Sequence, residues 1–304
     1  MTQHTSDAHH FRSLTVLMPG PSSTVQDAGR PGLAHLGIGH SGAADRGSYR
    51  LANRLVGNRE DEAALEVTFG GLAVRAEHHL VIAVTGAPCP ITVGAISYGV
   101  NAPISFGAGE QAILGIPATG LRSYLAVRGG IRVPAVLGSR STDILSGIGP
   151  APLRAGDILP IGSAYDVQPD LDVAAVAAPM AGDLTLAVRL GPRGDWFTPE
   201  AMDALLLGRY EVTADTNRVG MRLSGPALTR CRTDELPSEG MVTGAVQISA
   251  SGQPTLFLAD HPVTGGYPVI AVVEPADLDR AAQARPGQHL RFRSANQLVS
   301  SRIR

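Results

Sequence analysis

Short apolar segments recur at an even spacing along the chain, and this spacing limits the folds that the chain can adopt. In the first half they span residues 64–69, 80–85, 90–93, 111–115, 123–127 and 158–161, and in the second half 184–189, 210–213, 244–249, 255–259 and 268–273. Gly, Pro and Asn residues typical of turns separate them. The pattern favours a β-barrel or sandwich over alternating strands and helices. We therefore predict a mainly β fold with two closely packed, barrel-like units and a few short helices.

The length and one break in the pattern predict where the two units lie. A chain of 304 residues fits two domains of about 150 residues each. Residues 163–183 are rich in Pro, Asp and small side chains and are interpreted as a linker. The expected boundaries are a disordered polar tail over 1–13, a first β unit over 14–165 and a second over 184–304. The similar segments LRAGDILPIG and ARPGQHLRFR near the ends of the units favour two related barrels.

Two helices carry recognisable end signals. The first is expected from Asp45, a suitable N-cap, to Gly57, a suitable residue just past the end, with apolar positions at helical spacing. The second is expected to start with Thr198 as N-cap and Pro199 at the first helical position, and to end near Leu207.

Composition excludes several classes of function. The net charge of -2 offers no electrostatic basis for binding nucleic acid or an anionic membrane. No apolar run reaches the roughly 18 to 20 residues of a membrane span, and the N-terminus does not resemble a signal peptide. The two cysteines, Cys89 and Cys231, have neither disulfide-framework nor metal spacing, and no metal site is expected. We expect a cytoplasmic protein.

The absence of lysine removes further chemistry. All 25 basic residues are Arg. The chain therefore cannot carry covalent biotin or pyridoxal phosphate, form a Schiff base, or build a lysine-containing phosphate loop. Anions would be held by Arg side chains and by backbone amides.

The segment over residues 24–57, TVQDAGRPGLAHLGIGHSGAADRGSYRLANRLVG, is the strongest candidate for a small-molecule site. It combines several glycines with polar side chains, more than one structural loop requires. The polar side chains are Gln26, Asp27, Arg30, His35, His40, Ser41 and Asp45. The alternative is a polar loop that covers one end of a barrel.

Four further clusters combine Gly-rich turns with charged or amide side chains. They are LAVRGGIRVPAVLGSRSTD (125–143), ADTNRVGMRLSG (214–225), ELPSEGMVTGAVQI (235–248) and LADHPVTGGYPVIAVV (258–273). Arg forks beside Gly amides can hold phosphate or carboxylate, and a carboxylate in a tight turn, such as Glu239, can act as a general base. Each cluster can also be ordinary turn chemistry, as when Asn217 occupies a turn or Glu239 caps one.

Taken in order, STVQDAGRPGLAHLGIGHSGAAD, LAVRGGI, LGSRSTD, TNRVGMRL, LPSEGMV and TGGYPVIA resemble the allophanate hydrolase subunit 2 family. That family includes the C subunit of 5-oxoprolinase, the KipA proteins and the second half of the urea carboxylase carboxyltransferase domain. The resemblance implies a cyclophilin-like barrel and a KipI-like partner subunit. Allophanate hydrolysis of the amidase type uses a Ser-Ser-Lys arrangement, which a chain without lysine cannot form.

Three functions are compatible with the resemblance. The main one is a subunit of an ATP-dependent 5-oxoprolinase, which opens the lactam of 5-oxoproline to glutamate with KipI-like and LamB/YcsF-like subunits. ATP would be bound with or by a partner, and this chain would be inactive alone. The alternatives are a biotin-dependent carboxyltransferase half-domain acting on urea or another amide, and a KipA-like regulator that antagonises a kinase inhibitor.

We expect the clusters to converge on one cleft at the junction of the two units, where ligand sites are frequent. The catalytic candidates are Asp27, His35 and Glu239. The candidates for substrate binding are Gln26, Arg30, Ser41, Asp45, Arg140, Ser141, Asn217, Arg218, Thr264, Gly265 and Tyr267.

Overall fold

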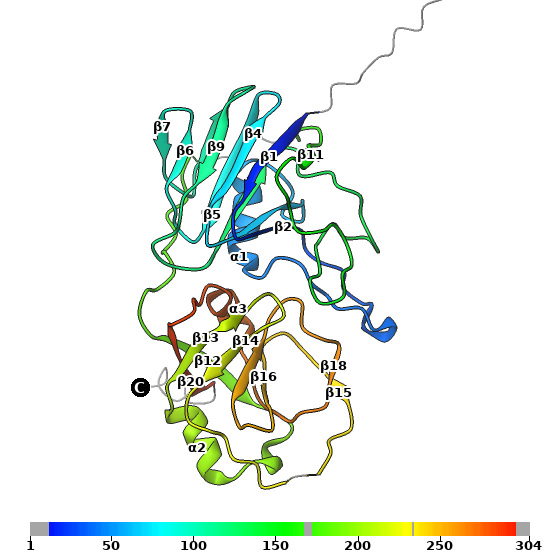
Figure 1. The fold of residues 1–304 in the computed structure, drawn as a ribbon, viewed down its shortest axis with the longest axis vertical. Helices are drawn as coiled ribbons and strands as arrows, with labels where there is room; N and C mark the ends of the chain where they lie inside the picture. The colour runs from blue at the N-terminus through cyan, green and yellow to red at the C-terminus, as the bar shows by residue number, and fades with distance from the viewer. Residues whose placement is uncertain (1–11, 167–171, 233, 296–304) are drawn as a thin grey trace, which may run out of the picture.

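The structure is a computed structural model that describes residues 12–166, 172–232 and 234–295. Two β-rich units follow each other along the long axis of the molecule, with the N-terminal unit above the C-terminal barrel (Figure 1). The mainly β fold with few short helices is as predicted. Of the tail expected over 1–13, residues 1–11 lie outside the described residues, whereas Ser13 begins a strand.

The first unit consists of two sheets. One has the order β11 (Ile158–Pro160), β1 (Ser13–Pro19), β4 (Leu72–Ala76), β9 (Gln111–Leu114), β6 (Ile91–Val93) and β7 (Ile96–Tyr98). The other has the order β2 (Ser22–Gln26), β3 (Ala64–Thr68), β10 (Arg122–Val127), β5 (Leu80–Gly86) and β8 (Pro103–Phe106). Their apolar residues form one buried cluster, which includes Leu14, Val16, Leu65, Val74 and Ile82. The unit is therefore two sheets that share a core, which is the sandwich alternative of the predicted pattern and not a closed barrel.

Helix α1 (Arg46–Leu55) covers the second of these sheets. Asp45 is its N-cap, as predicted, and accepts a hydrogen bond from the Ser48 backbone N–H. The buried face of the helix packs on Ala64, Ala83, Tyr124 and Ala126. Because the sheet is covered on both faces, every residue of β10 is buried, including its polar ones.

The second unit is a closed barrel of seven strands. Their order is β12 (Leu184–Leu190), β19 (Val269–Val273), β16 (Ala245–Ile248), β17 (Pro254–Phe257), β14 (Gly220–Ser224), β13 (Tyr210–Thr216) and β20 (His289–Ser294). The parallel pairing of β12 with β20 closes it. Helix α2 (Pro199–Leu207) starts at the predicted Thr198 cap. Helix α3 (Pro275–Ala282) and a small ribbon of β15 (Glu239–Gly240) with β18 (Thr264–Gly265) complete the unit.

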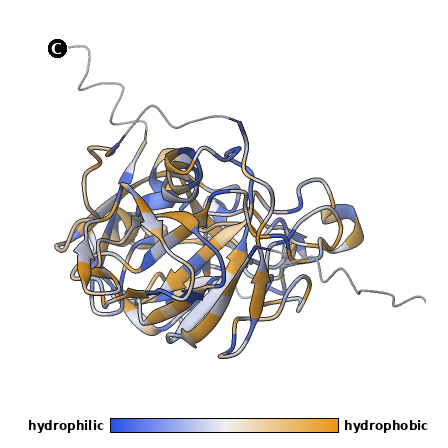
Figure 2. Cartoon of the chain, turned by 90° about the horizontal axis from the view of Figure 1, so that it is seen from above, coloured by the Kyte–Doolittle hydropathy of each residue, from blue (hydrophilic) through white to orange (hydrophobic). Residues whose placement is uncertain are grey.

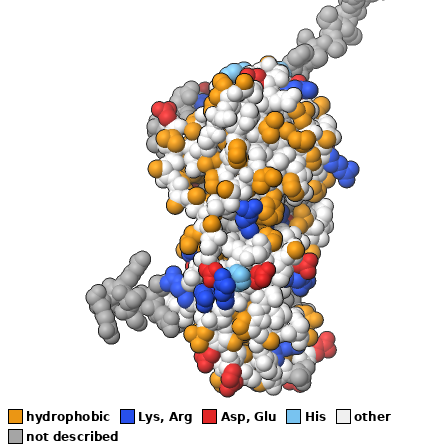
Figure 3. All heavy atoms as spheres, turned by 60° about the vertical axis from the view of Figure 1, so that its left-hand side comes forward, with side chains coloured by type: hydrophobic (Ala, Val, Ile, Leu, Met, Phe, Trp, Pro, Cys, Tyr) orange, Lys and Arg blue, Asp and Glu red, His pale blue; other side chains and the backbone are white. Residues whose placement is uncertain are grey.

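Hydrophobic residues occur along many of the strands drawn in Figure 2. On the face drawn in Figure 3, charges of both signs are mixed, so that face presents no extended patch of a single sign. Within the described ranges, no helix has the length and apolarity to cross a membrane.

Candidate functional site

Asp27 organises the loop that follows β2. Its carboxylate accepts hydrogen bonds from the Gly29 backbone N–H (2.8 Å), the Ser139 Oγ (2.6 Å), the Ser141 Oγ (2.6 Å) and the Arg140 backbone N–H (2.5 Å). Because the side chain is 7% exposed, these four bonds satisfy a carboxylate that is largely removed from water. Asp27 therefore joins two loops that are more than one hundred residues apart in the sequence.

Gly29 is required where this loop turns. Its φ of +86° lies in the left-handed region, and a Cβ there would approach the His40 carbonyl oxygen to 2.6 Å. The turn brings the buried Gln26, Arg30 and Ser41 into one layer. The Gln26 Nε2 donates to the Thr142 carbonyl oxygen, and the Ser41 Oγ lies 3.1 Å from the same oxygen.

Arg30 is a buried cation with few partners. Its Nη2 donates to the Ser141 carbonyl oxygen at 2.6 Å, whereas its Nε and Nη1 have no hydrogen-bond acceptor among the described residues. The Gln26 Oε1 and the Thr142 Oγ1 are buried and unpaired in the same layer. This layer thus retains hydrogen-bonding capacity that the described protein atoms do not use.

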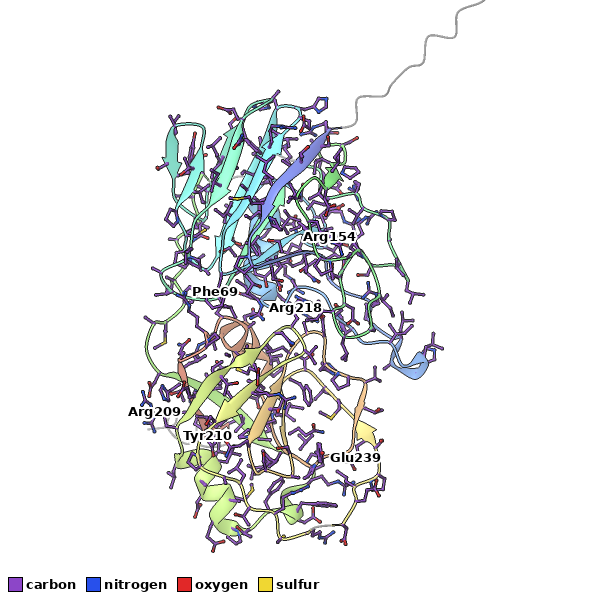
Figure 4. The ribbon with its side chains drawn as sticks, viewed as in Figure 1. Phe69, Arg154, Arg209, Tyr210, Arg218 and Glu239 are labelled. Carbon is purple, nitrogen blue, oxygen red and sulfur yellow. The ribbon has the colours of Figure 1, made fainter. Side chains whose placement is uncertain are left out.

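Arg218 is the centre of the contact between the two units (Figure 4). From the barrel side it binds Asp260 through two nitrogens, at 2.9 and 2.8 Å. Across the junction it donates to the Glu66 Oε1 at 2.6 Å and to the Gly42 carbonyl oxygen at 2.5 Å. Ser41 joins the same network, because its Oγ donates to the Asp260 Oδ1 at 2.7 Å.

The charges of this network set the pKa values of its members. Burial would lower the pKa of Arg218, but Glu66 and Asp260 outweigh it and raise this pKa well above its usual value. Burial would likewise raise the pKa of Glu66, but Arg218 and Arg122 outweigh it and lower the pKa of that carboxyl. Tyr124 and the Ala44 backbone N–H bind the other oxygen of Glu66 at 2.7 and 2.9 Å.

The lowered pKa of Glu66 predicts a specific loss of stability in acid. A carboxylate whose pKa is lower in the folded than in the unfolded chain stabilises the fold above the unfolded value, about 4.3, and loses that contribution as the pH falls through the folded value. We expect Glu66→Gln to reduce stability at neutral pH and to weaken its pH dependence below about pH 4. Urea unfolding of both proteins from pH 7 to pH 3 measures this. Parallel pH profiles would contradict it.

Gln283 forms a second connection between the units. Its Nε2 donates to the Asp45 Oδ2 at 2.7 Å and to the Arg122 carbonyl at 2.9 Å, and its Oε1 accepts from the Leu121 and Arg122 backbone N–H groups, both at 2.9 Å. Burial raises the pKa of Asp45. Asp45 thus both caps α1 and contacts the second unit.

The other predicted site residues lie outside this junction. His35 is exposed on the short 3-10 helix Ala34–Leu36. Arg140 directs its Nε to the Val133 carbonyl oxygen at 2.9 Å. Glu239 is ion-paired with Arg193, which lowers its pKa, and it lies far from Arg218 on the β15–β18 ribbon with Thr264 and Gly265 (Figure 4). The clusters therefore converge only in part: the loop after β2 connects to Arg218 through Ser41 and Asp260, whereas the segment with Glu239 lies elsewhere.

An open cavity of about 560 Å³ lies on the outer face of the barrel, and Asn217 and Tyr267 line it. Its floor is a row of three side chains on adjacent strands. Register places Arg222 opposite Thr255 and Thr255 opposite Gln247. The inward-facing neighbours Met221, Leu256 and Val246 belong to the barrel core. Asp215, Phe257 and Ser249 complete the lining among other residues.

A second cavity of about 500 Å³ lies between α1, α3 and the segment over 176–180. Asp45 and Gln283 line it, together with apolar side chains that include Leu51, Val176 and Met180. Within residues 12–166, 172–232 and 234–295, no group of three or more His, Cys, Asp or Glu side chains is placed to hold a metal ion.

Several residues of these sites were not singled out from the sequence. Glu66, Gln283, Arg222 and Gln247 were all missed. Glu66 and Gln247 each interrupt an otherwise apolar strand, and that signal could have identified both. Arg222 and Gln283 carry no comparable local signal, since polar residues are expected on an outer strand face and at the end of a helix.

Comparisons with known proteins agree with this architecture. Residues 36–294 match the family described as the carboxyltransferase domain, subdomain A and B. The chain is 39% identical over 284 residues to the C subunit of 5-oxoprolinase from Escherichia coli (strain K12), a match that covers 92% of this chain and 90% of that protein. It is 32% identical to urea amidolyase of Lachancea kluyveri, covering 94% of this chain but 17% of that protein.

Solved structures give the same result. The crystal structure of TTHA0988 superposes with a TM-score of 0.85 at 36% identity, covering 93% of this chain and 55% of that one. The K. lactis urea amidolyase superposes with a TM-score of 0.86 at 31% identity, covering 94% of this chain and 19% of that one. This chain thus spans about half of TTHA0988 and under a fifth of the amidolyase. The chain belongs to the family of the carboxyltransferase domain, subdomains A and B.

Proposed function

We propose that the chain acts in the cytoplasm as the C subunit of an ATP-dependent 5-oxoprolinase, an enzyme that hydrolyses the lactam of 5-oxoproline to glutamate. The observation that carries this proposal is the match to the corresponding 5-oxoprolinase subunit of Escherichia coli, which extends over 90% of that protein. The urea amidolyases match this chain over only a small part of their own length. The extent of these matches therefore favours the oxoprolinase subunit over the urea amidolyases.

We further propose that the predicted site residues have two roles, structural support and substrate binding. Asp27 and Arg218 are saturated with protein partners and hold the two units and the loop after β2 in place. Glu239 is neutralised by Arg193. We therefore assign these three residues to positioning rather than to proton transfer. The cavity on the outer face of the barrel is open and lined by both polar and apolar side chains, and we assign it to the substrate.

The remaining components are proposed to come from partner subunits. We propose that ATP is bound with or by a KipI-like subunit, because this chain has no lysine for a phosphate loop. A LamB/YcsF-like subunit completes the proposed complex. The match to about half of the TTHA0988 chain supports a second module of similar length beside this one.

The expected result is that the purified chain forms no glutamate from 5-oxoproline and ATP, whereas the chain mixed with its KipI-like and LamB/YcsF-like subunits does. Glutamate and ADP are measured by coupled assays, with each two-subunit mixture as a control. Turnover by the isolated chain, or its absence from the complete mixture, would reject the proposal.

The family match and the superposition on the K. lactis urea carboxylase favour a second candidate, carboxyl transfer from biotin on another protein to an amide such as urea. It predicts that this chain, with its partner and a carboxylated biotin carrier protein, carboxylates urea without glutamate formation. Labelled bicarbonate retained in an acid-labile amide product distinguishes the two.

A further inference from the structure

We propose that the cavity on the outer face of the barrel recognises a carboxylate-bearing lactam and that Arg222 is the residue that binds the carboxylate. The identity of that lactam as 5-oxoproline rests on the proposed function. The site itself rests on the row formed by Arg222, Thr255 and Gln247 and on the side chains that surround it.

Arg222 is a free cation in this cavity. It is exposed on β14, and within the described part of the chain its guanidinium makes no hydrogen bond or ion pair. Cross-strand neighbours have Cβ atoms about 5 Å apart, so Arg222 and Thr255 present their side chains together, as do Thr255 and Gln247. A guanidinium fork that is not paired within the protein can bind a carboxylate through two parallel hydrogen bonds.

Gln247 supplies an oriented acceptor. Its Nε2 donates to the Tyr267 carbonyl oxygen at 3.0 Å, and because a carbonyl only accepts, the amide cannot be reversed there. The Oε1 is left without a donor among the described residues. Gly265 makes room for this arrangement, since a Cβ at that position would lie 2.6 Å from the Gln247 Nε2. The side chain is 8% exposed, so its orientation is held by packing.

Asn217 supplies the complementary donor. Its Oδ1 accepts from the backbone N–H groups of Val219 (2.8 Å) and Gly220 (3.4 Å), which leaves the Nδ2 with no acceptor among the described residues. Both Asn217 and Gln247 line the cavity whose floor holds Arg222. A five-membered lactam with a carboxylate needs a cation, a donor for its carbonyl oxygen and an acceptor for its N–H. The cavity offers all three, and Phe257 and Tyr267 offer apolar contact to the ring.

The test uses the reconstituted three-subunit complex with Arg222→Ala, Arg222→Lys and Arg154→Ala. Arg154 is the matched control, because its side chain is also exposed and unpaired among the described residues but lies on the first unit (Figure 4). We expect Arg222→Ala to raise KM for 5-oxoproline by roughly 10- to 100-fold, the factor for losing a charged hydrogen bond, with a smaller effect on kcat. Arg222→Lys should recover part of this loss, and Arg154→Ala should match the unchanged protein.

Direct binding distinguishes failure of this inference from failure of the proposed function. Binding is measured by equilibrium dialysis of the full chain with labelled 5-oxoproline. Competition is measured with 2-pyrrolidinone, which lacks the carboxylate. We expect Arg222→Ala to lose its preference for 5-oxoproline over 2-pyrrolidinone. An active complex with an unchanged KM in Arg222→Ala overturns the inference alone. If the complex is inactive, the binding measurement tests the inference. The inference is overturned if the unchanged chain does not bind 5-oxoproline, or if Arg222→Ala binds it equally well.

Discussion

Replacing Arg218 with Ala is expected to lower the free energy of unfolding by about 3–5 kcal/mol, the cost of leaving buried carboxylates without their cation. Glu66 and Asp260 are each almost fully buried and both bind this guanidinium. The substitution would leave Asp260 without its cation and Glu66 with Arg122 alone at the junction of the units. Urea unfolding monitored by circular dichroism measures the change.

Two control variants distinguish the effect of the Arg218 charge on stability from the effect of its hydrogen-bonding geometry. Arg218→Lys keeps the cation but loses the planar fork, which makes four hydrogen bonds, two of them across the junction. We expect it to lie between the Ala variant and the unchanged protein. Arg154→Ala removes an exposed cation and should change stability by less than about 0.5 kcal/mol. A loss below about 1 kcal/mol in Arg218→Ala would show that the network contributes little.

Replacing Asp27 with Ala is expected to cost about 3 kcal/mol, because two buried hydroxyl donors and two half-buried backbone donors lose their acceptor, and each unpaired buried donor costs about 1–3 kcal/mol before relaxation. The donors belong to residues 29 and 139–141, so both loops should become more accessible. Unfolding in urea gives the stability, and limited proteolysis of the loops gives their accessibility.

Asp27→Asn is the informative companion, because an amide has one acceptor oxygen where the carboxylate has two. It should lose about half of the stabilisation. Asp61→Ala is the control, since among the described residues Asp61 forms an ion pair only with the exposed Arg59 and such pairs contribute little. Asp27→Ala with unchanged stability and unchanged proteolysis would mean that the carboxylate is not what holds the loops.

The features that could be predicted from the sequence are those that depend on residues close together in the chain. The start of α1 at Asp45 and of α2 at Thr198 follow from capping chemistry, which acts within one turn of helix. Most of the predicted strands also appear near their expected bounds, because their signal likewise lies in neighbouring residues. Helix α3 was missed, because it is only eight residues long and its N-cap residue, Glu274, makes no side-chain capping hydrogen bond.

The arrangement of the site could not be predicted in the same way. Arg218 was identified as a candidate, but its partner Glu66 is 152 residues away. The cavity floor depends on which residues of β14, β17 and β16 lie opposite one another, and that register is set by pairing over the whole barrel. Local sequence patterns therefore identify polar residues in loops. Which of these residues support the fold and which line an open surface depends on the tertiary contacts.

The order of the strands has a consequence for how the chain is made. The first strand of the barrel, β12, pairs with the last, β20, and in the first unit β1 pairs with β11 near its end. Neither sheet arrangement can therefore be completed until the final strand of its unit has left the ribosome. Long-range pairing of this kind slows folding, and domains generally fold as units in the order of synthesis. The N-terminal unit thus has time to fold before the barrel closes, and a nascent chain that stops before His289 would leave the edges of β12 and β13 open to aggregation.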